Sequence, residues 1–235
     1  MQTFKIFVLH VRNGYEARAI HVEHMTNRLG LKFEYITQGD VSDLTDVVME
    51  RWFAPTGELG HRSGATSCAY KHLLACKKIL DENLPGAVVL EDDILLRPNF
   101  TEIVERSIRE LPPDAPAIIN YEDSRLRFVP RSRRRPNHVI YIGDRDRYTG
   151  ALYINAAGAK AVLEAAESRR MSVPIDIFHR RLLEAGKITY WWSHPCPATQ
   201  GSFDGTFSSS LTNSHSKALV WRIKKAYRKL LYWFR

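Results

Sequence analysis

The sequence predicts an α/β fold in which helices cover a mostly parallel central sheet. Short apolar runs of strand length alternate with longer segments in which apolar residues recur at helical spacing. This alternation is typical of parallel sheets built from strand–helix–strand units. In addition, three carboxylates, Glu91-Asp92-Asp93, directly follow the unbroken apolar run 87–90. Open α/β sheets bind their ligands at this position, beyond the carboxyl end of a central strand.

The first half of the chain supplies the strand that ends in the carboxylates. Pro85-Gly86 turns the chain into that strand, and Asn99 with Glu102 three residues later predicts a capping box at the start of the next helix. In chain order, we expect a strand at 4–11, a helix at 15–29, a strand at 32–37, a helix at 41–53, a loop at 54–63, a helix at 65–80, the strand around Val88, and a helix through Glu110.

The second half continues the alternation after Pro112-Pro113. We expect strands at 117–121, 138–142, 148–154 and 188–192, and helices at 156–168 and 175–185. An arginine-rich stretch that runs to Asn137 separates the first two of these strands. The predicted organisation is one folded domain over residues 1–200, a polar, Ser-rich linker at 201–216 and a C-terminal helix at 217–235.

The net charge of +8 is unevenly distributed. Residues 125–147 hold eight arginines and two aspartates, and residues 217–235 hold seven Lys or Arg and no acid. The rest of the chain has 19 basic and 24 acidic residues and is mildly acidic. This distribution indicates two local contacts with anions, and we expect no nucleic-acid partner because such proteins are basic over a whole binding face.

The N-terminal segment and the hydropathy profile predict a cytoplasmic protein. Residues 1–5 lack the layout of a signal peptide, and no apolar stretch approaches the length of a membrane span. Three cysteines suggest no disulfide framework. Cys68, His72 and Cys76 share one helix face, but the outer two lie about 12 Å apart along a helix, too far to bind one zinc ion together.

The C-terminal helix has the pattern of a segment that lies on an anionic membrane. Basic residues fill much of the space between its apolar positions, and Trp221 and Trp233 add aromatic residues suited to an interface. The same periodicity is also typical of a helix packed on the protein's own core. The apolar residues that recur at helical spacing are Val220, Ile223, Tyr227, Leu230, Leu231 and Phe234.

Five blocks in order over residues 4–200 resemble glycosyltransferase family 25, the lipopolysaccharide and lipooligosaccharide glycosyltransferases, which include β-1,4-galactosyltransferase-like members. The blocks are Arg12 and Arg18 after the first strand, Ser67-Cys68-Ala69-Tyr70-Lys71-His72, Val88-Val89-Leu90-Glu91-Asp92-Asp93, Thr149-Gly150-Ala151-Leu152-Tyr153-Ile154 with Gly158-Ala159-Lys160, and Pro174-Ile175-Asp176. The resemblance implies a GT-A-type, Rossmann-like fold that binds a nucleotide sugar, usually UDP-galactose or UDP-glucose. It also implies a divalent metal, Mn²⁺ or Mg²⁺, and inversion at the anomeric carbon.

The chain departs from the family pattern at three positions. Ala65 follows Gly64 where the family usually has Glu, Lys71 precedes the histidine where it usually has Ser, and His10 ends the opening strand where it often has Asn. The implied acceptor is a lipooligosaccharide or lipopolysaccharide core, which would suit a protein attached to the cytoplasmic face of the inner membrane.

In such an enzyme the carboxylates have distinct expected roles. Side chains alternate along a strand, so Glu91 and Asp93 point to one side and are the expected metal ligands, with His194 as a third ligand. Asp92 is expected to face the nucleotide ribose. The alternative is a carboxylate cluster that pairs with nearby arginines.

The proton acceptor and the donor contacts are expected elsewhere. Asp176, at the start of a predicted helix, is the candidate general base, although a carboxylate there is also typical of helix capping. Arg12 and Arg18 suit phosphate or uracil, with a solvated helix face as the alternative. Gly150 suits close approach of the sugar, or a strand bulge, and His72 suits a donor contact or a structural role.

Two other classes of function remain open at this stage. A metal-dependent nucleotidyl- or phosphotransferase uses acids at the same strand end, and releases pyrophosphate instead of UDP. A catalytically disabled transferase scaffold that binds membranes or polyanions is the non-enzymatic alternative, and Ala65 and Lys71 are the residues that favour it.

Overall fold

A computed structural model describes residues 2–112, 114–204, 207 and 218–234 of the protein. Its strands are β1 (Lys5–Leu9), β2 (Glu34–Ile36), β3 (Gly86–Glu91), β4 (Ile94–Leu96), β5 (Ala117–Asn120), β6 (Ile140–Ile142), β7 (Ala151–Asn155), β8 (Thr189–Ser193) and β9 (Ala198–Gln200). Its α-helices are α1 (Glu16–Arg28), α2 (Asp46–Trp52), α3 (Gly64–Asp81), α4 (Phe100–Glu110), α5 (Ala156–Arg169), α6 (Ile175–Glu184), α7 (Gly201–Asp204) and α8 (Ala218–Phe234). Two short 3-10 helices, η1 (Val41–Asp43) and η2 (Arg131–Arg133), lie in connections.

The central sheet has seven strands in the order β2-β1-β3-β7-β5-β8-β6. Strands β1, β2, β3, β5 and β8 run in one direction, whereas β6 and β7 run in the opposite direction. The predicted α/β class with a mostly parallel central sheet is therefore confirmed. A second, two-stranded sheet pairs β4 with β9.

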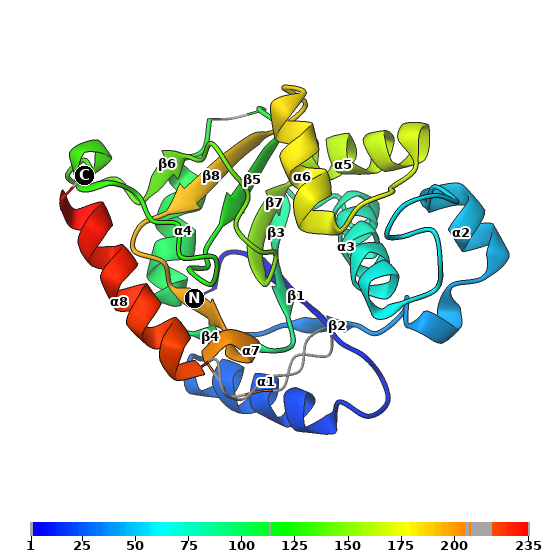
Figure 1. Cartoon of the computed structure of the whole chain (residues 1–235), viewed down its shortest axis with the longest axis horizontal. Helices are drawn as coiled ribbons and strands as arrows, with labels where there is room; N and C mark the ends of the chain where they lie inside the picture. The colour runs from blue at the N-terminus through cyan, green and yellow to red at the C-terminus, as the bar shows by residue number, and fades with distance from the viewer. Residues whose placement is uncertain (1, 113, 205–206, 208–217, 235) are drawn as a thin grey trace.

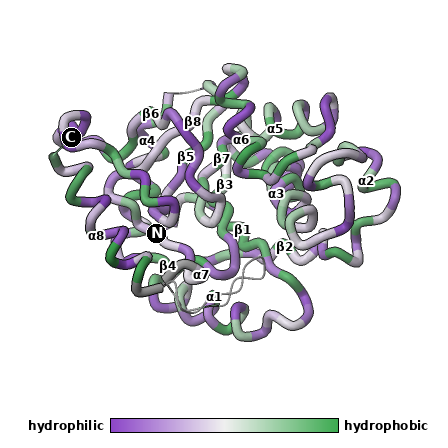
Figure 2. The backbone as a smooth tube through the Cα atoms, in the orientation of Figure 1, coloured by the Kyte–Doolittle hydropathy of each residue, from purple (hydrophilic) through white to green (hydrophobic). Residues whose placement is uncertain are grey.

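Helices cover both faces of the sheet, as Figure 1 shows. One apolar core packs α3, α5 and α6 against the face that carries Val89, and the other packs α1 and α4 against the face that carries Val88 and Leu90. All three of these β3 residues are fully buried. Figure 2 shows that hydrophobic residues follow one another along β1, in the middle of the molecule. The prediction of a central strand buried on both faces is therefore confirmed.

Local interactions explain where the elements differ from the predicted ranges. The helix predicted at 41–53 is split into η1 and α2, because the Thr45 side chain accepts a hydrogen bond from Val48 N and starts a new helix. The capping box predicted at Asn99 is wrong, because the Asn99 side chain makes no capping hydrogen bond to α4. The strands β4 and β9 went unpredicted, since runs of three residues carry little periodicity.

The C-terminal region contains two helices. Gly201–Asp204, within the predicted linker, forms α7, and most of the remaining linker lies outside the described residues. Helix α8 agrees with the predicted C-terminal helix and packs beside α7 and η2. Among the described residues, no helix combines the length and the apolarity needed to span a bilayer.

Candidate active site at the carboxyl end of the central strands

The three carboxylates lie at the edge of the sheet where β1, β3 and β5 end. Glu91 is the last residue of β3, and Asp92 and Asp93 form the turn that follows. The antiparallel strand β7 starts at the same edge, so Gly150 reaches the triplet, and its carbonyl accepts a hydrogen bond of 2.9 Å from Glu91 N. The predicted position at the carboxyl end of a central strand is therefore confirmed.

The Glu91 carboxylate is held by side chains from three other segments. It accepts hydrogen bonds from Thr149 Oγ1 at 2.8 Å and from Gln200 Nε2 at 3.1 Å. His72 of α3 is fully buried, and its Nε2 lies 3.4 Å from Glu91 Oε1. Cys68, His72 and Glu91 each offer one potential ligand atom, and these atoms all lie within 4.8 Å of one another. Cys76 is not part of this group. His72 thus supports Glu91 from the helix side.

Asp93 has the properties of an incomplete cation site. Its side chain is buried, and its Oδ1 has no hydrogen-bond partner among the described residues. Burial and the negative charge of Glu91 raise the pKa of Asp93. A divalent cation would relieve both effects, and two carboxylates are the hard oxygen ligands that Mn²⁺ and Mg²⁺ prefer. Glu91 and Asp93 therefore fit the expected metal.

Asp92 points away from this pair and is fully engaged by two basic groups. His10 Nδ1 lies 2.8 Å from its Oδ2, and Arg18 Nη1 donates to its Oδ1 at 2.7 Å. The Arg18 side chain is only 14% exposed, whereas a solvated arginine would be mostly exposed. Asp92 therefore fixes Arg18 at the edge of the site.

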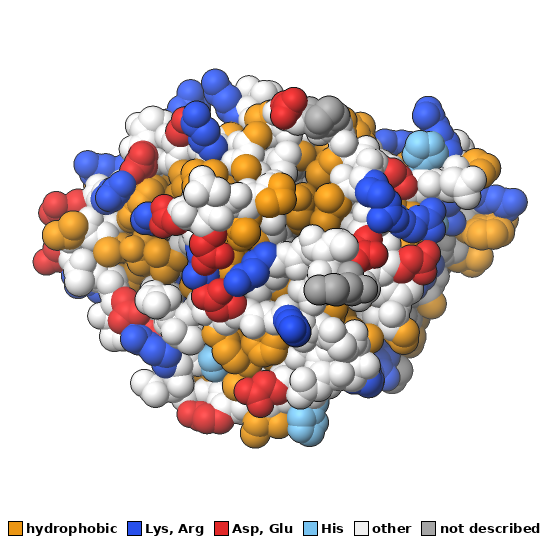
Figure 3. Space-filling model, turned by 180° about the vertical axis from the view of Figure 1, so that it is seen from behind, with side chains coloured by type: hydrophobic (Ala, Val, Ile, Leu, Met, Phe, Trp, Pro, Cys, Tyr) orange, Lys and Arg blue, Asp and Glu red, His pale blue; other side chains and the backbone are white. Residues whose placement is uncertain are grey.

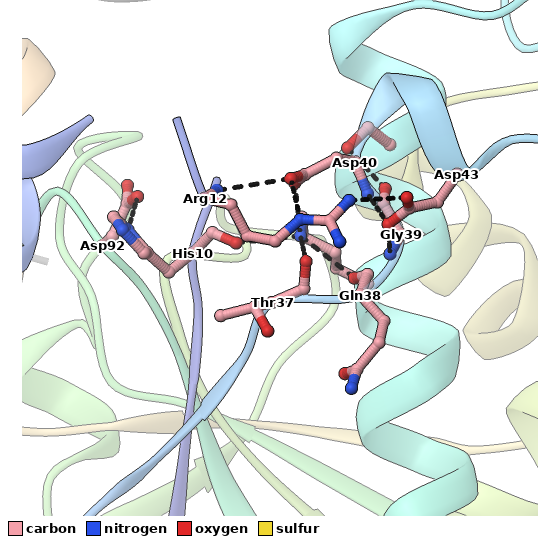
Figure 4. A network of polar contacts seen from close by, with 10 residues as sticks. His10, Arg12, Thr37, Gln38, Gly39, Asp40, Asp43 and Asp92 are labelled. Atoms are coloured by element: carbon pink, nitrogen blue, oxygen red, sulfur yellow. Dashed lines mark hydrogen bonds and ion pairs between the residues drawn. The ribbon is translucent and has the colours of Figure 1, made fainter. Parts of the chain in front are cut away.

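Arg12 belongs to a polar network at the ends of β1 and β2 that also includes His10 and Asp92 (Figure 4). Its Nε donates to Asp40 at 2.9 Å, and its Nη2 donates to Asp43 at 2.5 Å. Burial opposes the charge on Asp40, but hydrogen bonds from Lys71 and Arg12 outweigh it and hold the pKa of Asp40 below its usual value. The Arg12 side chain is still 43% exposed, so one edge of its guanidinium faces solvent.

Asp176 lies in the first turn of α6 and is mostly buried. Burial is the largest cause of its raised pKa, and Arg125 partly opposes this effect through a hydrogen bond of 3.0 Å. Burial also raises the pKa of the Cys68 thiol, helped first by the charge of Glu91 and then by that of Asp176. Asp176 and the triplet therefore act on the same thiol. The N-cap of α6 is Pro174, so Asp176 lies inside the first helical turn, where a hydrogen bond with the backbone of Ile177 lowers the pKa of its carboxyl.

The structure does not bring His194 to the carboxylates. His194 follows β8, and both β7 and β5 lie between β8 and β3 in the sheet. Three strand spacings amount to about 14 Å, and among the described residues Glu91, Asp93 and His194 form no group of ligand atoms within 4.8 Å. His194 instead lies against the ring of Tyr141, and burial, followed by nearby basic groups, lowers its pKa to about 4.

Three further residues complete the site but were missed from the sequence. Glu122 is fully buried beside Gly150, whose N–H donates to its Oε1 at 2.7 Å, and burial raises the pKa of Glu122 to about 8. The sequence contains a pattern that could have indicated Glu122, because Tyr121-Glu122-Asp123 follows β5 much as the carboxylate triplet follows β3. Thr149 opens one of the blocks that resemble the family but is not among the predicted site residues, and Gln200 carries no signal in the sequence.

Gly150 makes room for the side chain that holds Glu91. A Cβ atom at this position would lie 2.7 Å from Cγ of Gln200. Such an atom would push Gln200 away from Glu91. The predicted need for a glycine is therefore explained by packing against Gln200.

Comparisons with known proteins agree with this geometry. The model of the family described as "Glycosyltransferase family 25 (LPS biosynthesis protein)" matches residues 5–179. No curated protein sequence matches the chain.

Several solved structures align weakly with the chain. A glycosyltransferase involved in the glycosylation of the major capsid of PBCV-1 aligns with a TM-score of 0.47 and 10% identity, over 94% of this chain and 98% of that chain. Mouse xyloside xylosyltransferase 1 aligns with a TM-score of 0.41 and 14% identity, over 80% and 83%. The inositol-1-phosphate CTP transferase from T. maritima aligns with a TM-score of 0.35 and 14% identity, over 94% and 77%. These alignments are too weak to assign a function.

Proposed function

Because the chain belongs to glycosyltransferase family 25, we propose that this glycosyltransferase moves galactose or glucose from a UDP-sugar to a lipooligosaccharide core acceptor, with inversion at the anomeric carbon. The observation that carries the proposal is the carboxylate pair Glu91 and Asp93 at the ligand-binding edge of the sheet, in which Asp93 is buried and has an unsatisfied oxygen.

Glu91 and Asp93 are the residues that would hold Mn²⁺ or Mg²⁺. A cation bound there would neutralise the diphosphate as UDP leaves. Thr149 and Gln200 fix the Glu91 carboxylate by hydrogen bonds. The backbone of Asp93 is held at the sheet edge, because its carbonyl accepts a hydrogen bond of 2.7 Å from Gly201 N.

Arg18 is the best supported contact for the donor phosphates. Its guanidinium is fixed by Asp92, so little side-chain entropy is lost when it binds an anion. Arg12, which follows β1, is more exposed than Arg18 and suits the uridine. In this proposal Asp92 acts on the donor through Arg18.

Asp176 is the proposed general base. In a single displacement, the acceptor hydroxyl loses its proton as its oxygen attacks the anomeric carbon, and no covalent sugar–enzyme intermediate forms. Burial raises the pKa of Asp176, which makes the carboxylate a stronger base, while Arg125 holds the side chain in place. Gly150 and His72 belong to the wall of the site and position Glu91.

We also propose that α8 attaches the protein to an anionic membrane surface. One side of α8 is docked on the protein, since Trp221 Nε1 donates to Ser124 O at 3.2 Å and Lys225 pairs with Asp123 at 2.6 Å. The opposite side exposes Ile223, Tyr227 and Leu230, each at least 55% exposed. Green and purple alternate along α8 in Figure 2, as expected for a helix with apolar and basic residues.

Calorimetric titration with UDP-galactose and UDP-glucose, with and without Mn²⁺, tests the proposal. We expect binding that depends on Mn²⁺ in the wild type and is lost in Asp93→Asn, and release of UDP together with sugar transfer. Release of pyrophosphate would indicate a nucleotidyltransferase instead. Salt-sensitive polyanion binding without metal-dependent affinity for either UDP-sugar would indicate a disabled scaffold.

A further inference from the structure

Away from the carboxylate site, a cavity lies between α8, the segment that follows β5, and the connection from β8 to β9. Its volume is about 230 Å³, and neither Glu91 nor Asp93 lines it. Three basic side chains, Arg97, Arg134 and Lys229, line it together with His194. Phe128 and Trp233 supply aromatic walls. We call this cavity the basic pocket.

The positive charge of the basic pocket is not balanced by acids. Asp123 is the carboxylate in its wall, and it is already engaged by Lys225 at 2.6 Å and by Arg97 at 2.8 Å. Arg134 donates from Nε and Nη2 to the carbonyl of Val129, at 3.1 and 3.0 Å, which leaves its charge unpaired by any carboxylate among the described residues. Lys229 likewise has no carboxylate partner within the described part of the chain.

A buried arginine adds further positive charge behind the pocket. Arg147 is fully buried, and its Nη1 lies 3.4 Å from Sγ of Cys196, which lines the pocket. Its Nε and Nη2 have no hydrogen-bond partner among the described residues. The same positive charge acts on His194. Burial is the largest cause that lowers the pKa of His194 to about 4, and the charges of Arg134 and Arg147 lower it further. The guanidinium of Arg147 stacks on the ring of Trp192 at 4.6 Å, but no carboxylate among the described residues pairs with it. A buried charge without such a partner is costly, and an anion bound nearby would offset that cost.

Figure 3 shows Lys and Arg on several parts of the back face of the molecule, with Asp and Glu side chains among them. A further cation next to the basic pocket is Arg131, whose guanidinium lies over the ring of Trp233 at 4.2 Å.

We propose that the basic pocket binds a phosphate monoester group. The guanidinium of Arg134 and the ammonium of Lys229 supply charged donors for phosphate oxygens, and the aromatic walls suit the apolar face of an attached sugar or glycerol. The volume is below that of sites for drug-sized ligands, which begin at about 300 Å³, so it fits one phosphate with part of its carrier. The identity of the carrier rests on the proposed function, and is either the acceptor glycan or the head group of a membrane lipid.

Titration with inorganic phosphate, at constant ionic strength and without Mn²⁺, tests this site independently of any transfer activity. Arg134→Ala and Lys229→Ala should each weaken phosphate binding at least about tenfold, because each removes a charge-assisted hydrogen bond to the anion. Arg135→Ala and Lys224→Ala are matched controls, because both side chains are exposed and neither lines the pocket. Equal losses in the controls, or no phosphate binding by the wild type, would overturn the proposal.

Two further experiments identify the molecule that carries the phosphate group. If the phosphate belongs to the acceptor, the pocket variants raise the KM for a phosphorylated glycan acceptor but not for the same acceptor after phosphatase treatment. If it belongs to a lipid, they weaken sedimentation with phosphatidic acid vesicles and leave both KM values unchanged. Failure of sugar transfer with intact phosphate binding would reject the proposed function but not this site.

Discussion

The ammonium group of Lys71 lies 2.8 Å from a carboxylate oxygen of Asp40, and the two side chains are only 3% and 10% exposed. Lys71 Nζ also donates to the carbonyls of His10, Thr37 and Gln38, at 2.8, 3.2 and 3.0 Å. One buried lysine on α3 therefore ties together the segments that follow β1 and β2. Lys71, which the sequence resemblance marks as an expected departure from the family pattern, thus has a role in the scaffold of the site.

Replacement of Lys71 by Met should destabilise the fold by about 3–5 kcal/mol, because it leaves Asp40 as a buried charge without its main partner. Urea unfolding monitored by circular dichroism measures this change. Lys77→Met on the same helix is the control, since Lys77 is 58% exposed and Asp81 is its one ion-pair partner among the described residues, so its loss should cost at most about 0.5 kcal/mol. Similar midpoints for the two variants would refute the structural role of Lys71.

Asp176→Asn should lower kcat at least about a hundredfold, the lower limit of a typical general-base contribution. The affinity for UDP measured by calorimetry should stay within about twofold, because Asp176 does not contact the proposed diphosphate site. Glu184→Gln, an exposed position at the other end of α6, controls for effects on the helix. Full activity of Asp176→Asn would rule out the assignment of the base.

Glu122→Gln should change how stability depends on pH. Burial raises the pKa of Glu122 from 4.5 to about 8 in the folded protein. Between these values the folded state holds a proton that the unfolded state has released, so the wild type loses stability as the pH rises from about 4.5 to about 8. The neutral glutamine removes this dependence and should be more stable than the wild type at pH 8, by an amount on the order of a few kcal/mol.

Thermal unfolding in EDTA, at several pH values, measures the difference between the two proteins. EDTA matters because a bound cation would stabilise the ionised carboxylates. Glu164→Gln is the control, since its side chain is 66% exposed and should show the wild-type dependence. Parallel pH profiles for Glu122→Gln and the wild type would show that Glu122 is ionised in the folded protein.

The sequence predicts the sheet and the position of the triplet because both depend on local patterns. Residues 87–90 form a run too apolar for an edge strand, and carboxylates after such a run indicate a site. The partners of these carboxylates depend on strand order, which local patterns do not contain. His194 was expected beside Glu91 because both follow strands, but β7 and β5 lie between these strands in the sheet. Gln200 reaches Glu91 from a strand of three residues that no periodicity reveals.

The exposed side of α8 provides the last prediction. Leu230 and Phe234 are 55% and 78% exposed and lie one turn apart, and Arg228 and Lys229 flank them. Burial of a Leu or Phe side chain in a bilayer interface contributes about 1.5–3 kcal/mol, and each basic residue near an anionic surface adds about 1 kcal/mol.

Leu230→Glu with Phe234→Glu should therefore lower the affinity for phosphatidylglycerol vesicles at least about a hundredfold in a sedimentation assay. Trp221 and Lys225 still dock the helix on the protein in this variant, so activity on a water-soluble acceptor should not change. Ile20→Glu with Val47→Glu is the matched control, because it places two charges on exposed apolar residues of α1 and α2. If the α8 variant sediments with vesicles as well as this control does, the exposed side of α8 does not bind the membrane and the helix serves only to cover its own domain.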